Sequence, residues 1–211
     1  MVLQPREGFA QGIGNGYGGG GGVIYHLTRS GLLGLRFDIS GVQYGHESKE
    51  VPLSGTIGSR IIVKVNTNNS ITALSLAPEL AKPSGRVRPY VNVGYSAVLF
   101  RTTSSVPKLD SSDGGNTSTT NFKDSNRAWV YGGGLRVQLG GHTSPLTLDA
   151  GLRYNRGGTA SYLREGSIQD NSDGTITITP LTSRTPFLVY TVGVKFRIPY
   201  NSKKSCARFL C

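Results

Sequence analysis

The feature that most constrains this chain is a repeated alternation of apolar and polar residues. From Leu33 to Ser40 the odd positions are Leu, Leu, Phe and Ile, and the even positions are Gly, Arg, Asp and Ser. The same period of two returns at 87–99, 129–139 and 146–155. Successive side chains of a β-strand point to opposite faces of a sheet, so this period predicts strands. No stretch of comparable length has a helical period, and we predict an all-β protein.

The connections between these segments alternate in length. Short connections rich in turn residues lie at 29–31, 83–85 and 140–144, and long polar segments lie at 45–59, 102–121 and 155–185. In an antiparallel meander this order places the short turns at one end and the long loops at the other. We therefore predict an eight-stranded antiparallel up-and-down transmembrane β-barrel. The expected strands lie near 8–17, 22–28, 31–46, 60–80, 86–104, 122–140, 145–163 and 184–199, with a further hairpin at 161–168 and 175–179.

These strands define a barrel domain at 8–199, between an N-terminal lead at 1–7 and a basic tail at 200–211. The tail holds both cysteines, Cys206 and Cys211, which could pair with each other or link two chains. No disulfide framework is therefore expected in the barrel. The first seven residues have no apolar core like that of a signal peptide. We expect either that the protein is not exported or that the sequence is a processed or truncated form.

The face opposite the apolar stripe combines charges with glycines. Glycine makes up 30 of the 211 residues, which disfavours helices because an interior glycine costs a helix about 1 kcal/mol. On a soluble barrel the charged face would simply meet water. A narrow lumen, in contrast, needs small residues between large ones, and this favours charges inside and apolar residues toward lipid. The glycines on this face are Gly12, Gly14, Gly16, Gly34, Gly94, Gly132, Gly134, Gly151 and Gly193.

The charged residues of this face predict a network inside the lumen. Unpaired charges there would carry a large desolvation cost, so we expect each carboxylate to contact more than one arginine and to fill the lumen. A narrow anion-preferring channel lined by arginine is the alternative. The predicted network comprises Arg36, Asp38, Glu79, Arg88, Arg136, Asp149, Arg153, Lys195 and Arg197.

The last strand carries a spaced motif at Thr191, Gly193, Phe196 and Ile198. This motif resembles the signal that ends bacterial outer-membrane barrels and is read by the barrel-assembly machinery. Residues 6–199 as a whole resemble small OmpA-like outer-membrane β-barrel proteins. Besides the motif of the last strand, the segments that carry this resemblance are Pro5–Phe9, the Gly-x-Gly-x-Gly-Tyr run ending at Tyr17, Arg88–Gly94 and Asp149–Tyr154. The resemblance implies the outer membrane of a Gram-negative-type bacterium as the location. It implies membrane lipid, lipopolysaccharide and the assembly machinery as partners.

Other motifs do not support an enzyme, a cofactor or a metal. Gly14-x-Gly16-x-x-Gly19 matches a dinucleotide fingerprint by letter but lacks its βαβ unit. The histidines His26, His46 and His142 have no recognisable spacing to a serine nucleophile. Asp110 and Asp113 lack the ligand spacing of a calcium loop. The net charge of +11 is dispersed without an aromatic-lined stripe, so nucleic acid is not expected.

The sequence thus predicts a non-enzymatic barrel with a structural or surface-interaction role, in envelope integrity or in adhesion and recognition by its long loops. Two alternatives stay open. One is the narrow anion channel. The other is a non-membrane, extracellular β-rich subunit that forms filaments, which the lack of a signal peptide would favour.

Overall fold

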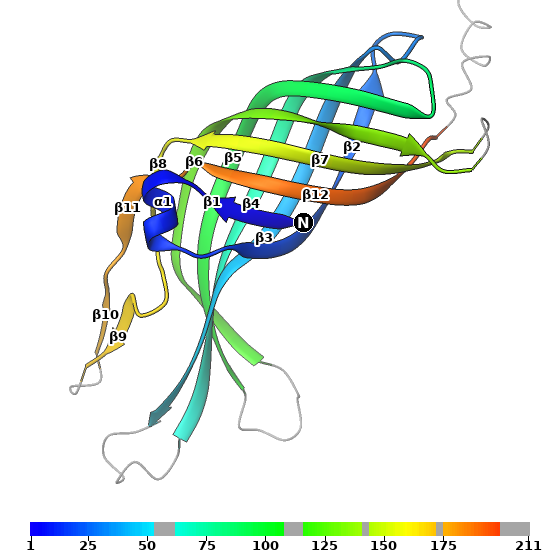
Figure 1. The fold of residues 1–211 in the computed structure, drawn as a ribbon. Coiled ribbons are helices and arrows are strands. Elements are labelled where there is room, and N and C mark those ends of the chain that lie inside the picture. The colour runs from blue at the N-terminus through cyan, green and yellow to red at the C-terminus, as the bar shows by residue number, and fades with distance from the viewer. Residues whose placement is uncertain (53–61, 108–115, 141–143, 172–174, 199–211) are drawn as a thin grey trace, which may run out of the picture.

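The computed structural model describes residues 1–52, 62–107, 116–140, 144–171 and 175–198. Eight antiparallel strands are hydrogen-bonded into a closed barrel in the order β1-β12-β7-β6-β5-β4-β3-β2 (Figure 1). They are β1 (Val2–Pro5), β2 (Gly16–His26), β3 (Leu33–Pro52), β4 (Ile62–Ala81), β5 (Val87–Pro107), β6 (Asn116–Gln138), β7 (Leu146–Gly157) and β12 (Phe187–Phe196). The predicted all-β class and the eight antiparallel strands are confirmed.

The predicted start of the ring was wrong. We expected strands at 8–17 and 22–28, with the glycines at 18–22 as the connection between them. Instead, β1 is Val2–Pro5, in the expected lead, and the helix α1 (Glu7–Gly12) follows it. The glycine run lies inside β2 and pairs with Val42–Asp38 of β3. A Cβ added at Gly18, Gly20 or Gly22 would collide with a carbonyl of β3, so these three glycines allow two backbones to approach closely rather than form a turn.

At one end of the ring, the turn end, the strands are joined by short connections at 27–32 and 82–86. Gly31 and Gly85 have φ values of 76° and 106° there. Glycine adopts this left-handed region at no steric cost, which explains its place in both turns. The predicted short turns at these two positions are confirmed.

At the opposite end, two strand pairs continue well beyond the ring (Figure 1). The β3–β4 pair extends to Pro52 opposite Ile62, and the β5–β6 pair extends to Pro107 opposite Asn116. Much of the predicted loops at 45–59 and 102–121 is therefore strand. Runs of threonine at 102–103 and 119–120 favour the extension of the β5–β6 pair, because β-branched residues favour the extended backbone.

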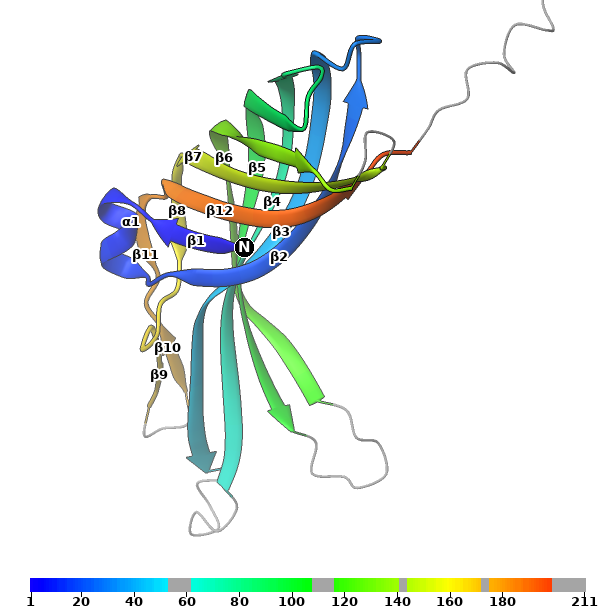
Figure 2. The same cartoon turned by 45° about the vertical axis from the view of Figure 1, so that its right-hand side comes forward.

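The third long segment folds over this same end. The strand β8 (Thr159–Tyr162) pairs with β11 (Leu181–Arg184), and β9 (Ile168–Asp170) pairs with β10 (Ile176–Ile178). A hairpin at this place is confirmed, but only Ile168 of its predicted first strand belongs to it, because Ser161 and Tyr162 pair with β11 instead. The helix α1 lies beside these strands at this end (Figure 2). We call β8–β11 together with α1 the cap, and this end of the ring the cap end.

The core of the protein lies where the cap enters the ring. Phe9 of α1 is fully buried and packs edge-on against Phe100 and Tyr162, with ring centroids 5.9 Å and 4.9 Å apart, and it also contacts Phe187. The helix is thus held by aromatic packing despite its length of six residues. Among the described residues, no helix has the length and apolar character needed to cross a membrane.

Candidate functional site

The outer face of the ring carries an apolar belt. Across neighbouring strands Phe37 pairs with Leu76, Leu76 with Tyr95 and Tyr95 with Trp129, and all four side chains are exposed. Tyr95 and Trp129 also touch edge-on at a centroid distance of 5.5 Å. Further exposed members of the belt are Val23, Tyr25, Leu35, Ile39, Leu74, Leu80, Val87, Val91, Val93, Tyr131, Leu135, Leu148, Leu152, Tyr190, Val192, Val194 and Phe196.

The inner face of the turn half carries a cluster of charges, which we call the plug. At its centre is Glu79, a carboxylate only 1% exposed. Its Oε2 lies 2.5 Å from Nη2 of Arg136 and 3.4 Å from Nη1 of Arg36. One buried carboxylate therefore holds two buried guanidinium groups.

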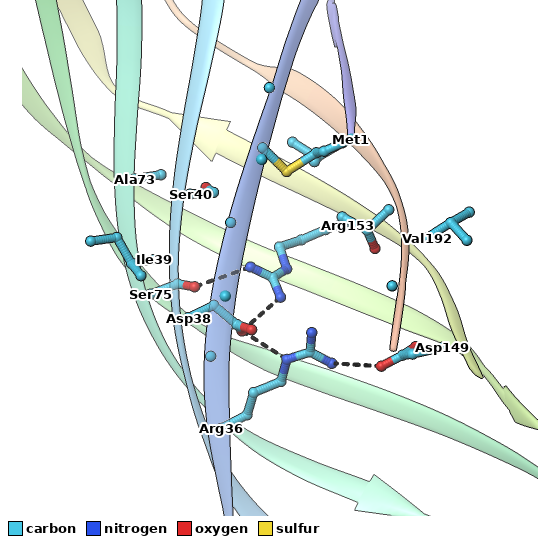
Figure 3. Close-up of a pocket in the computed structure, with 18 of the residues that line it drawn as sticks. Met1, Arg36, Asp38, Ile39, Ser40, Ala73, Ser75, Asp149, Arg153 and Val192 are labelled. Carbon is cyan, nitrogen blue, oxygen red and sulfur yellow. Dashed lines mark hydrogen bonds and ion pairs between the residues drawn. The ribbon is translucent and has the colours of Figure 1, made fainter. Parts of the chain in front are cut away.

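Asp38 forms a second bridge within the plug. Its Oδ2 lies 2.7 Å from Nε of Arg36 and 2.7 Å from Nη2 of Arg153 (Figure 3). Arg153 also donates to Oγ of Ser75 at 3.1 Å. Since Arg36 contacts both Asp38 and Glu79, the two carboxylates belong to one continuous network.

Asp149 completes the plug. It forms an ion pair with Lys195 and lies 3.7 Å from Nε of Arg136 and 4.0 Å from Nη1 of Arg36. Each of the three carboxylates thus contacts at least two arginines, in agreement with the sequence-based expectation. The plug holds four cations and three carboxylates, so only one positive charge of the net +11 is unbalanced within it.

Tyr90 also belongs to the plug, although the sequence did not single it out. Its hydroxyl donates to Oδ1 of Asp149 at 2.8 Å, and its ring centroid is 4.1 Å from Cζ of Arg136. Arg36 and Lys195 also face this ring, at 5.5 Å and 5.4 Å. Its position on the charged face of β5 was the only available signal, because alternation does not report which residues meet across strands.

Two residues of the predicted network lie outside it. Arg88 is half-buried at the turn end and donates to Oγ1 of Thr147 at 3.4 Å, and Arg197 is exposed. Within the described ranges, neither forms an ion pair with a carboxylate. The prediction of a nine-residue network was therefore too wide.

Glycines allow this crowding. An added Cβ at Gly134 or Gly151 would lie 2.6 Å or 2.5 Å from Oη of Tyr90, and one at Gly132 would lie 2.6 Å from Oδ1 of Asn92. The expected role as small lumen residues thus holds there. It does not hold for Gly14 or Gly193, where an added Cβ meets no atom within 4 Å. Gly12 and Gly16 instead give space to Tyr162 and Val42 at the cap end.

A cavity of about 420 Å³ lies inside the ring beside the plug. Arg36, Asp38 and Arg153 face it from one side, and Met1, Phe187 and Val189 line it as well (Figure 3). Toward the cap end, the aromatic cluster around Phe9 follows. The lumen is therefore filled at two levels, by charges in the turn half and by rings in the cap half.

The cap is tied to β3 by polar contacts beyond the belt. Oε2 of Glu47 accepts the backbone N–H of Gly166 at 2.9 Å, and Lys49 donates to the carbonyl of Ile168 at 2.9 Å. The hydrogen bond from Gly166, aided by Lys49, holds the pKa of Glu47 below its usual range. These contacts connect the cap to the projecting β3–β4 hairpin.

The four residues of the predicted assembly motif occupy both faces of β12 and its end. Thr191 faces inward and donates to the carbonyl of Gly151 at 3.2 Å, and Gly193 pairs with Asp149. Phe196 and Ile198 are exposed. Recognition of this motif by the assembly machinery stays a prediction.

No group of three or more His, Cys, Asp or Glu side chains capable of holding a metal occurs in the described parts of the chain. His26 and His46 lie on different strands. The candidate calcium residues Asp110 and Asp113, the histidine His142, and Cys206 and Cys211 of the tail lie outside the described residues.

No protein family model, curated protein or solved structure matches this chain. The likeness to small outer-membrane barrels therefore rests on the motifs of the chain itself.

Proposed function

We propose that this protein is an integral β-barrel of the bacterial outer membrane with a structural or surface-interaction role. The observation that carries the proposal is the polarity of the ring. Arg36, Glu79, Arg136 and Asp149 are buried inside it, whereas Phe37, Trp129 and the rest of the belt are exposed outside it. In water this arrangement is unfavourable, because soluble monomers rarely expose apolar patches larger than a few hundred Å². In a bilayer it is the expected one.

The belt has a basic border on the side of the cap. Arg127 lies two residues beyond Trp129 on β6, Arg156 of β7 pairs with Trp129, and Arg101 pairs with Lys123. All four cations are exposed. Basic side chains beside an aromatic belt suit the phosphates of lipopolysaccharide, so we assign the cap end to the outer surface and the turn end to the periplasm.

The contents of the lumen favour anchoring and display over transport. Both the plug and the aromatic cluster would have to move before an ion could pass. We therefore expect no single-channel events when the purified protein is added to planar bilayers. Steps of anion-selective conductance would instead support the channel alternative and overturn the structural role.

The membrane location can be tested with Trp129, the only tryptophan of the chain. In vesicles of phosphatidylcholine brominated on its acyl chains, we expect its fluorescence to be strongly quenched, since its indole lies on the belt. A control variant combines Trp129→Phe with Thr119→Trp, which places the indole ten residues farther along β6, on a projecting hairpin. Its fluorescence should be quenched much less, because ten strand residues span about 34 Å.

Equal quenching at the two positions, or none at either, would overturn the membrane proposal. A protein that is monodisperse without detergent would do the same. Filaments under electron microscopy would favour the extracellular subunit instead. Heat-dependent migration on a detergent gel then reports closure of the ring separately from insertion.

A further inference from the structure

The ring is closed by a single short strand. β1 pairs with β12 over Val2–Pro5 but with β2 only at Val2 and Leu3. One further contact joins them, from the N–H of Gly18 to the carbonyl of Met1 at 3.2 Å. Beyond this level, as far as the structure describes the chain, β2 pairs only with β3 and β12 only with β7.

These two strand edges border the same opening, which we call the seam. Gly18–Gly22 of β2 and Thr191–Lys195 of β12 line one cavity, with Met1 between them (Figure 3). Three of the four outward side chains along the seam are more exposed than the belt residues of β3–β7, the fourth being Val194 at 53%. Val23, Val192 and Phe196 are 68%, 75% and 72% exposed, compared with 44% for Phe37 and 45% for Leu152. The difference is what a missing neighbouring strand would produce.

We propose that the seam is a docking site for an extended polypeptide segment that runs in line with β1 and joins it on the amino side of Met1. β2 and β12 are both antiparallel to β1, so one strand can pair with both edges at once, as β1 already does. Along the seam the backbone N–H and C=O groups of both edges need partners, and such a strand would supply them.

The register defines the length of this segment. Val2 lies opposite Tyr17 and Tyr190, which places Met1 opposite Gly18 and Thr191. Five more positions then match Gly19–Val23 on one side and Val192–Phe196 on the other. A segment of about five residues therefore fills the seam to the end of β12.

The two faces of the wall define its chemistry. Counted back from Met1, the first, third and fifth positions lie beside the outward residues Val192, Val194 and Phe196 and should be apolar. The second and fourth lie beside Gly193 and Lys195, above the cavity, and should be small or polar. An added Cβ at Gly19 or Gly21 meets no atom within 4 Å, so these outward glycines leave room for large neighbours in the docked strand.

A strand joined to β1 is favoured over a separate peptide. β1 fixes its direction and register, and a covalent connection avoids the loss of translational and rotational freedom on binding. A strand inserted from a second copy would have to end against Met1, which already occupies the seam.

Disulfide formation provides the test. In a background with Cys206→Ser and Cys211→Ser, the segment Val-Ser-Cys-Ser-Val is added directly before Met1, together with Val194→Cys. The added cysteine would then lie opposite residue 194, within disulfide reach. We expect mild oxidation of the folded protein in detergent to give an intramolecular disulfide in most molecules. The matched control carries Leu148→Cys instead, which pairs with Val194 and so lies one strand farther away.

Three outcomes would overturn the proposal: no disulfide, similar yields for the two cysteine positions, or mainly intermolecular disulfides. The last would assign the seam to a second copy. A cysteine-free check compares the protein with and without an added Val-Ser-Val-Ser-Val segment. Amide hydrogen exchange at Gly19–Val23 and Val192–Phe196 should slow at least tenfold, and unchanged exchange would also overturn it. No step requires a bilayer, so the result is separate from the test of membrane insertion.

Discussion

Tyr90 and Asp149 are joined across the inside of the ring by a hydrogen bond of 2.8 Å, although they belong to strands that are not neighbours. Tyr90 is on β5 and Asp149 on β7, with β6 between them. Gly134, the partner of Tyr90 on β6, leaves the space through which the tyrosine reaches. The plug therefore ties the wall together across strands as well as filling it.

Removal of the central carboxylate should weaken the barrel strongly. Glu79→Gln removes, in a buried site, the nearer of the two carboxylates that Arg36 and Arg136 share. We expect the free energy of unfolding to fall by about 3–5 kcal/mol, the usual cost of removing one partner of a buried ion pair. Urea unfolding in detergent micelles, followed by Trp129 fluorescence, measures it. The exposed Glu50→Gln should change stability by less than about 0.5 kcal/mol, and equal effects of the two variants would contradict this assignment.

The glycines of the wall should differ sharply in their tolerance to alanine. At Gly94 an added Cβ would collide with the carbonyl of Leu76 and lie 2.5 Å from Cα of Ala77, so Gly94→Ala should destabilise the barrel by about 1–3 kcal/mol. At Gly21 it meets no atom within 4 Å, and Gly21→Ala should be nearly neutral. Thermal unfolding of both variants measures the difference. A neutral Gly94→Ala would show that the strands approach less closely than described.

The contact between β3 and the cap should weaken in acid. The hydrogen bond from Gly166 lowers the pKa of Glu47 from its ordinary value of 4.5. The contribution of Glu47 to stability is therefore present above that value and is lost as the pH falls through the lowered pKa. The amide NMR shift of Gly166 should titrate with a midpoint below 4.5, and Glu47→Gln should abolish this step. A step that persists in Glu47→Gln would assign it to another carboxylate, such as Glu165.

The basic border of the belt should contribute to binding of lipopolysaccharide. The double variant Arg127→Gln, Arg156→Gln removes two exposed cations beside Trp129, and we expect weaker retention of lipopolysaccharide on the detergent-solubilised protein. Because phosphate contacts are charge-assisted, the loss should be greatest at low salt. The control pairs Arg184→Gln in the cap with Arg6→Gln before α1, which changes the net charge equally. Equal losses would indicate attraction by net charge alone.

Alternation predicted which residues of the long strands lie inside and outside the ring, because successive side chains of a strand point to opposite faces. Arg36, Asp38, Glu79, Arg136, Asp149 and Arg153 come together for this reason. The contacts among them depend on the stagger between strands, which alternation does not report. Arg88 and Arg197 share the pattern but form no ion pair with these carboxylates in the parts of the chain that the structure describes. Tyr90 is recognisable as central only once three cations surround its ring.

The failures at the N-terminus have a different cause. β1 has only four residues, too few for a period to be recognised. The five consecutive glycines at 18–22 fit both a turn and a place where two backbones nearly touch, and local sequence cannot distinguish these cases. The cap was not predicted as a folded unit. It packs where the inward face of β5 changes from polar residues to the apolar Val98 and Phe100, which belong to the same buried cluster as Phe9 of α1.

The two ends of the segment between β7 and β12 lie side by side, since Asn155 pairs with Phe187. Residues near these ends, such as Tyr162, belong to the core, whereas the β9–β10 hairpin farther out does not. The ring therefore does not depend on how long that outer hairpin is, and each doubling of a flexible loop costs only about 0.6 kcal/mol. A peptide tag inserted after Asn171 should leave the barrel intact, which would make this hairpin a natural place for length variation and a practical handle for labelling the protein.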